Sequence, residues 1–315
     1  MLSDYLSYFL VPRAFYRHRL NAVLDSLNGA ERRLVGERTE YYNKLSAPVP
    51  LSGGVTVGHY RFPFKKKDFG DKKSRLSTYF FDQYEVMRYF PSADRFRYIH
   101  GDVTHTPAEP TFVKSRPITG DNANAVILKL NKRRHFRFVD DPTPFADKKD
   151  MLVWRANWCN AKPWRRQFCE MFVNDSMCDV GKVKPEPDED FPESVKGFVP
   201  IERQLGYKFI ACIEGNDVAT SLKWVMSSNS VAVSPPMRYE TWFMEGRLRP
   251  DYHYIEVAPD YSDLKDKLKY YISHPAEAEA IIAHAHEWVG QFRDSRTELA
   301  TQLNVARKYF DLTNS

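Results

Sequence analysis

Residues 207–224, which read YKFIACIEGNDVATSLKW, decide the fold class of this 315-residue chain. The first seven are mostly apolar, aromatic or β-branched, as in a buried strand; residues 214–217 (EGND) have turn chemistry, and apolar residues then recur at helical spacing. After a polar break at 227–229, residues 230–233 (SVAV) predict a second strand that ends at a Pro-Pro pair. The stretch therefore predicts a βαβ unit of an α/β protein.

Composition and charge limit the class of protein. A chain with 43% hydrophobic and 14% aromatic residues is globular, and its length fits two medium domains. The net charge is +5, and cations are concentrated in residues 65–75 (KKKDFGDKKSR) and 129–138 (KLNKRRHFRF). These runs favour an anionic partner, although solvated loops carry the same residues.

The cysteines and the amino-terminal segment bear on localisation. Cysteines 159, 169, 178 and 212 lack metal-binding spacing, and no secretion signal is recognisable, so we expect a reducing, cytoplasmic compartment. No apolar run approaches the roughly 20 residues of a membrane span. Residues 5–20 (YLSYFLVPRAFYRHRL) mix aromatics with arginines and could lie peripherally on the anionic inner face of the cytoplasmic membrane. The alternative, which this segment alone favours, is a helix packed on the protein body.

The first half combines helices with short strands. We expect helices over the first 45 residues and near 77–89. Short strands are predicted at 97–102, 111–115, 125–130 and 135–139. A polar, Pro-containing connection at 140–150 suggests a boundary, so we assign a first domain to residues 1–145.

The second half alternates strands with helices. Besides the βαβ unit, we predict strands at 151–155 and 253–257, a Pro-rich acidic loop at 182–194, and helices at 164–172, 239–245, 263–272 and 276–292. We assign a second domain to residues 146–292 and a C-terminal helix to 293–315, packing back on the first domain. Open parallel sheets of this kind bind ligands at the carboxyl ends of their strands.

The turn at Gly215 is a candidate anion site. A helix that starts just after a strand offers free N–H groups and the positive end of its dipole. The candidate phosphate contacts are Gly215, Asn216, Asp217, Thr220, Ser221 and Lys223. The turn alone favours the simpler interpretation, an ordinary βα turn with Asn216 or Asp217 as N-cap. Glu214 and Asp217 oppose phosphate binding unless their side chains point away.

Three arginines could converge on the same crevice. Arg155 lies at a predicted strand end, and Arg165 and Arg166 lie at a predicted helix start. Guanidinium groups bind phosphate oxygens well, but surface solvation is an equally good explanation for arginines in such positions.

Asp102 is the candidate general base. In residues 100–107 (HGDVTHTP) it follows a strand, between His100 and His105. A carboxylate there, facing a cleft between domains, could take a proton from an incoming hydroxyl group, although strand-end aspartates are commonly turn formers. The two histidines have no third ligand at a recognisable spacing, and we treat the carboxylates of residues 188–190 (DED) as a chance match. We therefore predict no metal site.

Several segments in order resemble glycosyltransferase family 90, which includes bacterial lipopolysaccharide glycosyltransferases, fungal capsule-associated proteins and animal protein O-glucosyltransferases. The resemblance is strongest to the bacterial lipopolysaccharide core branch and covers roughly residues 77–290. It is carried by residues 77–91 (STYFFDQYEVMRYFP), 101–118 (GDVTHTPAEPTFVKSRPI), 122–141, 148–156 (KKDMLVWRA), 178–181 (CDVG) and 207–257.

The resemblance implies a GT-B fold, with two Rossmann-like domains facing a cleft and an extra helical N-terminal segment. It implies inverting, metal-independent transfer of a sugar from UDP-glucose, UDP-galactose or UDP-xylose, with no cofactor. Asp102 becomes the catalytic base, the Gly215 turn the diphosphate cradle, and Arg155 with Arg165 or Arg166 the leaving-group stabilisers. The implied acceptor is an anionic glycan or glycolipid, most simply the lipopolysaccharide inner core.

Further assignments follow from the same motifs. We assign His105, Lys114 and Arg116 to the acceptor side, and Glu240 to ribose hydroxyls, with a helix N-terminal carboxylate as its alternative role. The chain departs from the family in having Arg155-Ala156 where Arg-Gly is common, and Ser221 where animal members carry arginine.

Two other functions are compatible with the sequence. The chain could be an inert family relative that serves as a binding module, or a glycosyltransferase acting on a protein or capsule acceptor. We expect no nucleic-acid partner, because the cations are not interleaved with an exposed aromatic platform.

Overall fold

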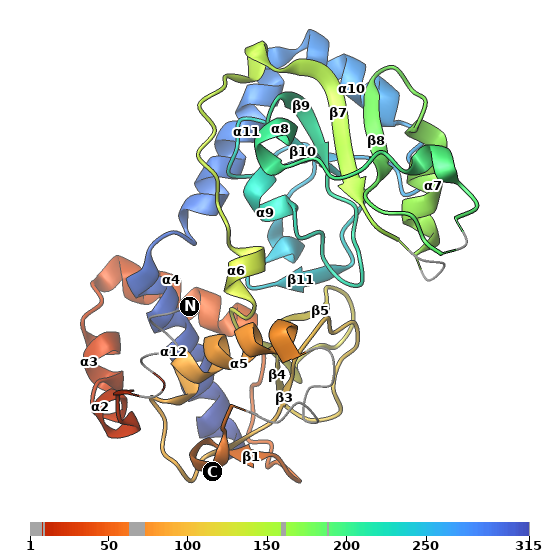
Figure 1. The fold of residues 1–315 in the computed structure, drawn as a ribbon. Helices are drawn as coiled ribbons and strands as arrows, with labels where there is room; N and C mark the ends of the chain where they lie inside the picture. Colours follow the sequence, from red (N-terminus) through yellow and green to blue (C-terminus); the bar gives the residue numbers. More distant parts are fainter. Residues whose placement is uncertain (1–7, 9, 63–72, 159–161, 188, 315) are drawn as a thin grey trace. The chain divides into compact units, whose positions relative to one another are not determined.

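The structure is a computed structural model that describes residues 8, 10–62, 73–158, 162–187 and 189–314. It is an α/β structure with two compact units (Figure 1). The first unit takes in the chain up to Arg134, Tyr239–Met244 and Phe292–Ser315, and the second takes in His135–Arg238 and Glu245–Gln291. The sequence placed boundaries after residues 145 and 292 and expected the C-terminal helix to return to the first domain, whereas the chain also returns to the first unit at Tyr239–Met244.

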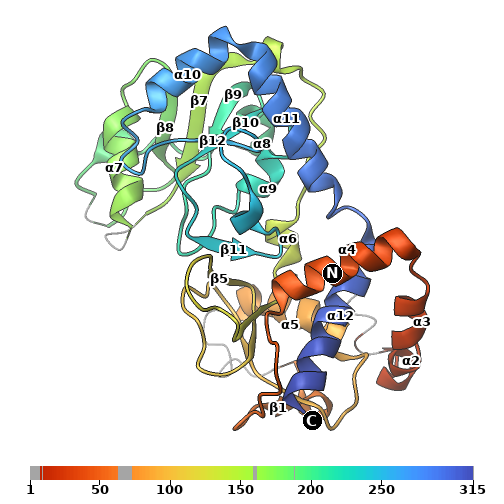
Figure 2. The same ribbon diagram turned by 180° about the vertical axis from the view of Figure 1, so that it is seen from behind.

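The helices of the first unit assemble around its last helix. They are α2 (Arg13–Arg17), α3 (Leu20–Asp25), α4 (Gly29–Tyr42), α5 (Lys73–Met87) and α12 (Ser295–Thr313). A capping box between Asn28 and Glu31 starts α4, and the Asp294 carboxylate caps α12. Helix α12 lies along α4 (Figure 2) and also contacts α3 and α5. The two long helices share a buried ion pair between Arg38 and Glu298 at 2.6 Å.

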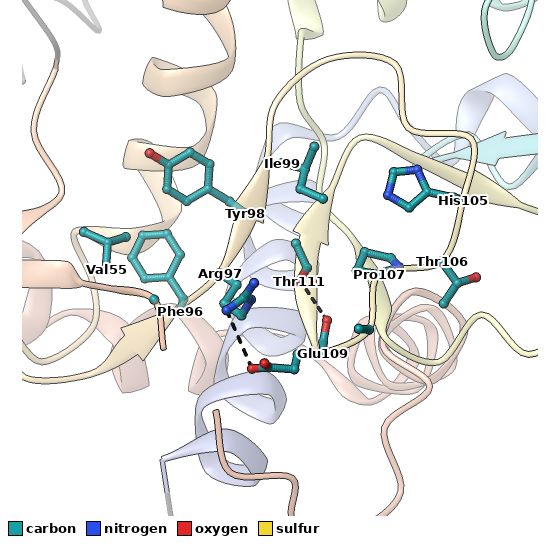
Figure 3. A pocket seen from close by; sticks show the side chains of 12 residues that line it. Val55, Phe96, Arg97, Tyr98, Ile99, His105, Thr106, Pro107, Glu109 and Thr111 are labelled. Carbon is teal, nitrogen blue, oxygen red and sulfur yellow. Dashed lines mark hydrogen bonds and ion pairs between the residues drawn. The ribbon is translucent and has the colours of Figure 1, made fainter. Parts of the chain in front are cut away.

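Short strands complete the first unit. Strands β1 (Val55–Thr56) and β2 (Arg95–Phe96) pair antiparallel, and the 3₁₀ helix η1 (Val57–His59) follows β1. Strands β3 (Tyr98–Ile99), β4 (Thr111–Val113) and β6 (Ala125–Ile127) form a parallel sheet in the order β3-β4-β6. Strand β5 (Ser115–Pro117) pairs antiparallel with β11 (Tyr239–Thr241). A pocket in this unit is lined by residues of β3, by Thr111 of β4 and by the loop of residues 105–109 (Figure 3).

The second unit is built on a five-stranded parallel sheet. Its strands are β7 (Lys149–Ala156), β8 (Cys178–Lys182), β9 (Tyr207–Ala211), β10 (Val231–Ser234) and β12 (Ile255–Glu256). The spatial order is β12-β10-β9-β7-β8, and neighbouring strands are parallel. From β7 the chain passes first to β8 on one side and then to β9 on the other. This is a doubly wound order, and its topological switch point lies between β7 and β9.

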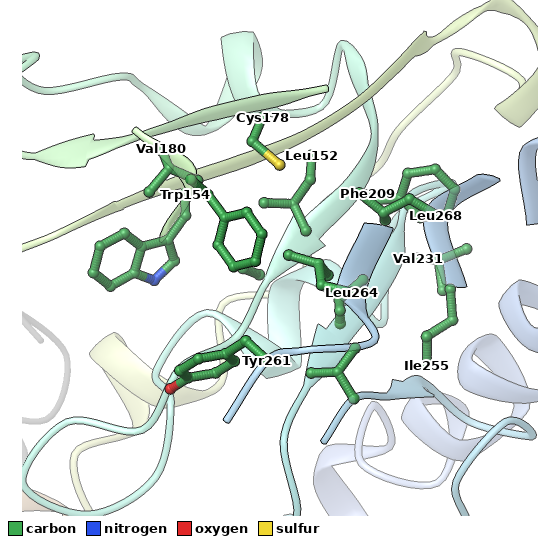
Figure 4. Packing of buried hydrophobic residues seen from close by; sticks show 14 of the residues in the cluster. Leu152, Trp154, Cys178, Val180, Phe209, Val231, Ile255, Tyr261, Leu264 and Leu268 are labelled. Atoms are coloured by element: carbon green, nitrogen blue, oxygen red, sulfur yellow. The ribbon is translucent and has the colours of Figure 1, made fainter. Parts of the chain in front are cut away.

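Helices and 3₁₀ turns connect these strands. They are η4 (Phe145–Asp147), α7 (Pro163–Phe172), η5 (Pro192–Ser194), α8 (Ile201–Gln204), α9 (Leu222–Val225), η6 (Glu245–Arg247), α10 (Leu264–Ser273) and α11 (Pro275–Gly290). The core lies between the sheet and α7, α10 and the first turns of α11. Figure 4 shows Leu152, Phe209 and Ile255 from three strands facing Leu264 and Leu268 of α10. Burying such side chains contributes roughly 1.5–3 kcal/mol each, which stabilises the sheet that carries the site.

Three local predictions are wrong. Residues 135–139 form no strand, because the described chain there is the end of α6 (Lys132–His135) and an extended connection. Residues 239–245 are β11 and a turn instead of a helix, since Tyr239, Thr241 and their aromatic neighbours suit the open edge of β5. The helix expected directly after the turn at 214–217 starts late: residues 218–221 are irregular, and α9 begins only at Leu222.

Among the described residues, no helix is long and apolar enough to cross a membrane. Cys169, Cys178 and Cys212 are free, buried thiols, and burial raises the pKa of each. Cys159 and residues 65–72 of the first basic run lie outside the described residues, and only the backbone of residues 73–75 is described.

Candidate functional site

Arg165 lies at the switch point of the second unit and joins two strand ends. Its guanidinium Nη1 donates to the carbonyl oxygen of Asn157, just after β7, at 2.9 Å. Its Nη2 and Nε donate to the carbonyl oxygens of Ile213 and Glu214, just after β9, at 2.8 and 2.9 Å. The positive charge is therefore fixed in the crevice where doubly wound sheets bind ligands.

Gly215 lies against this guanidinium. A Cβ atom at Gly215 would meet Arg165 Nη2 at 3.0 Å. Any side chain here would therefore push Arg165 away from the strand ends. The glycine predicted from turn chemistry serves the close approach of this arginine.

A second arginine and two aromatic residues complete the crevice. Trp164 Nε1 donates to the Glu214 carbonyl oxygen at 2.9 Å, and Tyr261 Oη donates to the Trp164 carbonyl oxygen at 3.3 Å. The guanidinium of Arg238 lies 4.7 Å from the Trp164 ring centroid, within the range of a cation–π contact. Arg238 Nε also donates to Glu214 Oε2 at 2.8 Å.

Glu214 does not oppose an anion in the way its position in the sequence suggested. Its carboxylate accepts the Arg238 side-chain bond and also the Arg238 backbone N–H at 2.9 Å. Its charge is thus paired locally, and the Arg165 guanidinium donates to three backbone carbonyl groups beside it. This balance suits a phosphate group at the sheet edge.

Arg155 takes a different direction from the predicted one. Its guanidinium donates to the Asp179 carbonyl oxygen and to Asp179 Oδ1, both at 2.6 Å, so the side chain runs back along the sheet to β8. Burial raises the pKa of Asp179, but hydrogen bonds from Arg155 and Tyr207 outweigh this and leave that pKa lowered. In the part of the chain that the structure describes, Arg155 Nε is buried without a hydrogen-bond partner.

Arg166 and Lys223 are engaged in ion pairs away from the Arg165 crevice. Arg166 donates to Glu170 Oε1 and Asp190 Oδ2 at the surface, each at 2.7 Å. Lys223 is fully buried and pairs with the buried Glu245. Both positive charges are therefore balanced by carboxylates of this unit.

The remaining residues of the predicted cradle lie in the irregular segment after Gly215. Asn216 is exposed, Asp217 is buried, and Thr220 and Ser221 are half-buried. The Ser221 hydroxyl contacts Cys212 Sγ at 3.5 Å. Since α9 starts at Leu222 and has four residues, Ser221 is its N-cap without a side-chain capping bond, whereas Asn216, Asp217 and Thr220 precede the helix N-terminus that the sequence predicted for them.

Asp102 lies in the first unit, just after β3. Its Oδ1 accepts a bond from Lys114 Nζ at 2.5 Å, and the Asp102 side chain is 24% exposed while that of Lys114 is buried. The lysine thus fixes an accessible carboxylate by a charge-assisted hydrogen bond. Nearby, His100 Nε2 contacts Gln83 Oε1 at 2.8 Å, and burial lowers the pKa of His100 to about 3, so its imidazole is neutral.

Arg116 and Glu240 form a buried pair in the first unit. Arg116 Nε donates to Glu240 Oε1 at 2.7 Å, and its other nitrogens donate to the carbonyl oxygens of Tyr41, Tyr42 and Ala125. Tyr41 Oη donates to the second Glu240 oxygen. Glu240 lies on β11 and not at a helix N-terminus. Because both of its carboxylate oxygens accept these bonds, a contact with ribose would require the bonds to open.

His105 is exposed and lines the pocket beside β3 (Figure 3). Within the described residues, no group of three or more His, Cys, Asp and Glu side chains could hold a metal ion.

The sequence missed Trp164, Arg238 and Tyr261 as members of the crevice. Arg238 follows β10 by four residues, so its position after a strand was a usable signal. Trp164 lies in the first turn of α7 next to Arg165, whereas Tyr261 has a positive φ of 63° in a loop and gives no signal in sequence.

Comparison with known proteins identifies relatives of the chain. The family model for glycosyl transferase family 90 matches residues 130–297. The chain is 41% identical over 313 residues to the O-glucosyltransferase LpsA of Dichelobacter nodosus, covering 96% of this chain and 92% of that protein. Shorter similarities link it to uncharacterized protein 035R of Invertebrate iridescent virus 3, at 30% identity over 31% of this chain and 9% of that protein. Uncharacterized protein 027R of Frog virus 3 is 33% identical over 32% of this chain and 11% of that protein.

Proposed function

Since this chain belongs to glycosyltransferase family 90 and is a transferase, we propose that it moves a hexose or xylose from a UDP-sugar to a glycan hydroxyl group with inversion. The GT-B architecture and independence from metal ions and cofactors are part of the proposal. The observation that carries it is Arg165, anchored to both strand ends of the switch point. UDP-glucose is the first donor to test, because the relative in Dichelobacter nodosus is named an O-glucosyltransferase.

The donor diphosphate binds at the Arg165 crevice in this proposal. Negative charge grows on the leaving UDP as the bond to the sugar breaks, and a guanidinium that is already fixed stabilises this charge without reorganising. Arg238, which lies over the Trp164 ring, balances the Glu214 carboxylate at the same edge of the sheet, so that this carboxylate does not repel the diphosphate. Arg155 contributes only if its buried guanidinium reorients from Asp179.

Asp102 is the proposed general base. Its carboxylate takes the proton from the acceptor hydroxyl as that oxygen attacks the anomeric carbon, while the bond from this carbon to UDP breaks. A single displacement inverts the configuration and forms no covalent intermediate. Lys114 holds the carboxylate in position through its 2.5 Å bond and is a positioning residue on the acceptor side.

The proposed acceptor is an anionic glycan or glycolipid, the lipopolysaccharide inner core, met in the cytoplasm at the inner face of the membrane. Arg133 and Arg134 of α6 are exposed, which supports an anionic acceptor. The basic run contributes less than the sequence suggested, because Lys129 is buried in an ion pair with Glu298. Exposed Leu10 and Phe15, next to the exposed Arg17 and Arg19, support contact with a bilayer.

A thermal-shift panel tests the donor part of the proposal. UDP, UDP-glucose, UDP-galactose, UDP-xylose, GDP and CMP are compared in EDTA and again with Mn²⁺. A ligand that binds only the native state raises the midpoint, so we expect UDP species to stabilise the protein in EDTA, and GDP and CMP to have no effect. No response to any UDP species in either condition would contradict the proposal.

The Asp102→Asn variant tests the base. We expect kcat to fall by about 10²-fold or more, because the amide cannot accept the proton, with the UDP thermal shift unchanged. Lys114 can still donate to the amide oxygen, so the loop keeps its anchor. Turnover close to that of the wild type would show that another group is the base.

A further inference from the structure

The first unit contains a pocket of about 450 Å³ that the proposed mechanism does not use. It lies over β3 and the start of β4 and is bounded by the loop of residues 105–109 (Figure 3). Figure 3 shows Tyr98 and Arg97 on one side of it, with His105 and Glu109 on the loop side. Its volume falls in the range typical of small-molecule sites.

Two side chains of opposite charge face this pocket, and they are too far apart to form a hydrogen bond with each other. The guanidinium of Arg97 is 41% exposed and the carboxylate of Glu109 is 27% exposed, with 3.7 Å between Nη1 and Oε2. This distance is too long for a hydrogen bond, so a ligand can insert its own donor and acceptor groups. An exposed ion pair of this kind contributes little to stability by itself.

Hydrogen bonds hold parts of both charged residues in fixed positions. Glu109 accepts bonds from the Ser52 backbone N–H at 3.1 Å and from the Ser52 hydroxyl, and these bonds lower the pKa of Glu109. The backbone of Arg97 is fixed by bonds to Tyr309 Oη and the Phe112 N–H, at 3.1 and 2.9 Å. The Glu109 carboxylate and the Arg97 backbone are therefore fixed before a ligand binds, while the Arg97 guanidinium can adjust to it.

Tyr98 supplies an aromatic surface beside these charges. Its side chain is 38% exposed, and its ring packs edge-on against Tyr60 and lies 4.6 Å from His100. An exposed ring held in place offers a flat apolar face with little entropy left to lose on binding.

We propose that this pocket binds a neutral sugar residue of the glycan acceptor. Sugar hydroxyl groups accept from a guanidinium and donate to a carboxylate, and the C–H face of a pyranose covers an aromatic ring. One cation and one anion cancel, so the pocket favours an uncharged sugar over a phosphorylated one. Its role as an acceptor subsite rests on the proposed function.

The position of the pocket fits this role. His105 lines it and follows Asp102 by three residues, so their Cα atoms are at most about 11 Å apart. A sugar in the pocket would thus occupy an acceptor position close to the segment that carries the proposed base.

Ligand-observed NMR on the full chain tests the inference. The probes are methyl glucoside, methyl galactoside, lactose and glucose 6-phosphate. We expect millimolar binding of at least one neutral probe, and no tighter binding of the phosphorylated sugar. Tyr98→Ala and Glu109→Gln should each weaken neutral binding at least 10-fold, and Glu109→Gln keeps the shape of the side chain. Tyr270→Ala, which removes a ring 44% exposed on the second unit, is the matched control and should bind normally.

The outcomes separate this inference from the proposed function. No saturation transfer to any neutral probe, unchanged binding by both pocket variants, or clearly tighter binding of glucose 6-phosphate would each overturn the inference. The UDP-sugar thermal shift of the same variants reports on the donor site and should equal that of the wild type. If the wild type bound sugars but did not respond to UDP-sugars, the proposed function would fail and the sugar pocket would stand.

Discussion

Arg165 and Arg166 are adjacent in sequence but differ in their contacts. Arg165 donates to three carbonyl oxygens at two strand ends, whereas Arg166 pairs with two carboxylates at the surface. The sequence placed both near the crevice, because it shows the start of a helix but not the direction of each side chain. The partner of Lys223 could not be predicted from sequence either, because Glu245 lies 22 residues further along the chain.

Substituting each arginine by lysine separates their roles. Lysine lacks the planar fork that reaches several carbonyl groups at once. We expect Arg165→Lys to raise the KM for the UDP-sugar and to lower kcat/KM about 10-fold or more. Arg166→Lys, the matched control, should stay within about 2-fold, since exposed ion pairs contribute little. Steady-state kinetics with varied donor measures both, and equal effects in the two variants would contradict the assignment of Arg165.

Asp82 makes stability depend on pH in a defined direction. Burial raises the pKa of Asp82 from 3.8 to about 7, although Lys132 lowers it through its charge and its backbone N–H bond. The folded state therefore holds this proton more tightly than the unfolded state. This contribution is fully present below about pH 4 and is lost as the pH rises through about 7.

The Asp82→Asn variant should remove this dependence. We expect its free energy of unfolding, measured relative to the wild type by urea denaturation, to rise between pH 5 and pH 8 by about 1–4 kcal/mol. The amide oxygen can still accept the Lys132 N–H bond. A difference between variant and wild type that is the same at every pH would show that Asp82 does not titrate in this range.

At the scale of elements, the sequence predicted the βαβ order around Gly215 but not the length of its helix. Strands β9 and β10 are parallel neighbours with α9 between them, as expected. Val218 and Leu222 are buried at helical spacing, yet Val218 lies in the irregular segment. Apolar spacing records burial, and here tertiary packing buries Val218 without a helix, next to turn residues of low helix propensity.

The amino-terminal segment has one packed face and one exposed face. Arg13 donates to the Tyr60 carbonyl oxygen at 2.7 Å and lies over the Tyr84 ring, so α2 is anchored to the body of the unit. Leu10 and Phe15 remain 72% and 50% exposed, and Arg17 lies beside them in sequence and is exposed. Both interpretations of this segment are therefore compatible with its structure.

Vesicle binding tests the exposed face of this segment. We expect the protein to co-sediment with phosphatidylglycerol vesicles and not with phosphatidylcholine vesicles, because apolar contact and cations act together. The double variant Leu10→Ser, Phe15→Ser should bind about 100-fold more weakly, since each apolar side chain contributes roughly 1.5 kcal/mol and each 1.4 kcal/mol is about tenfold in affinity. Phe198→Ser, at a position 73% exposed on the second unit, is the control. Equal loss in the control would show that general hydrophobicity, and not this segment, causes binding.

At the scale of the whole molecule, the first unit is assembled from three separate parts of the chain. Residues 239–244 belong to it because β11 completes a ladder with β5, and α12 belongs to it because it packs along α4. Composition and turn signals mark where a linear chain bends, but they do not show which distant segment covers an exposed edge. This is why the α/β class and the return of the C-terminal helix were predicted from sequence, while the return of residues 239–244 to the first unit was not.

The net charge of +5 favours binding of an anionic acceptor, so we expect this binding to depend on salt concentration. Arg133 and Arg134 are exposed at α6, where salt screens their field: the Debye length falls from about 10 Å at 0.1 M to about 3 Å at 1 M. We expect the KM for a phosphorylated core acceptor to rise about 10-fold between 50 and 500 mM NaCl. After phosphatase treatment, the KM for the same acceptor should change little with salt. The double variant Arg133→Gln, Arg134→Gln should make the KM for the phosphorylated acceptor less dependent on salt.

The KM for the UDP-sugar should depend less on salt than the KM for the acceptor. Arg165 is held among backbone carbonyl groups in a partly buried crevice, and partly buried charges are screened less. If the KM for the phosphorylated acceptor did not depend on salt, electrostatic recognition by these arginines would be contradicted. The enzyme would then have to select its acceptor by the neutral sugars.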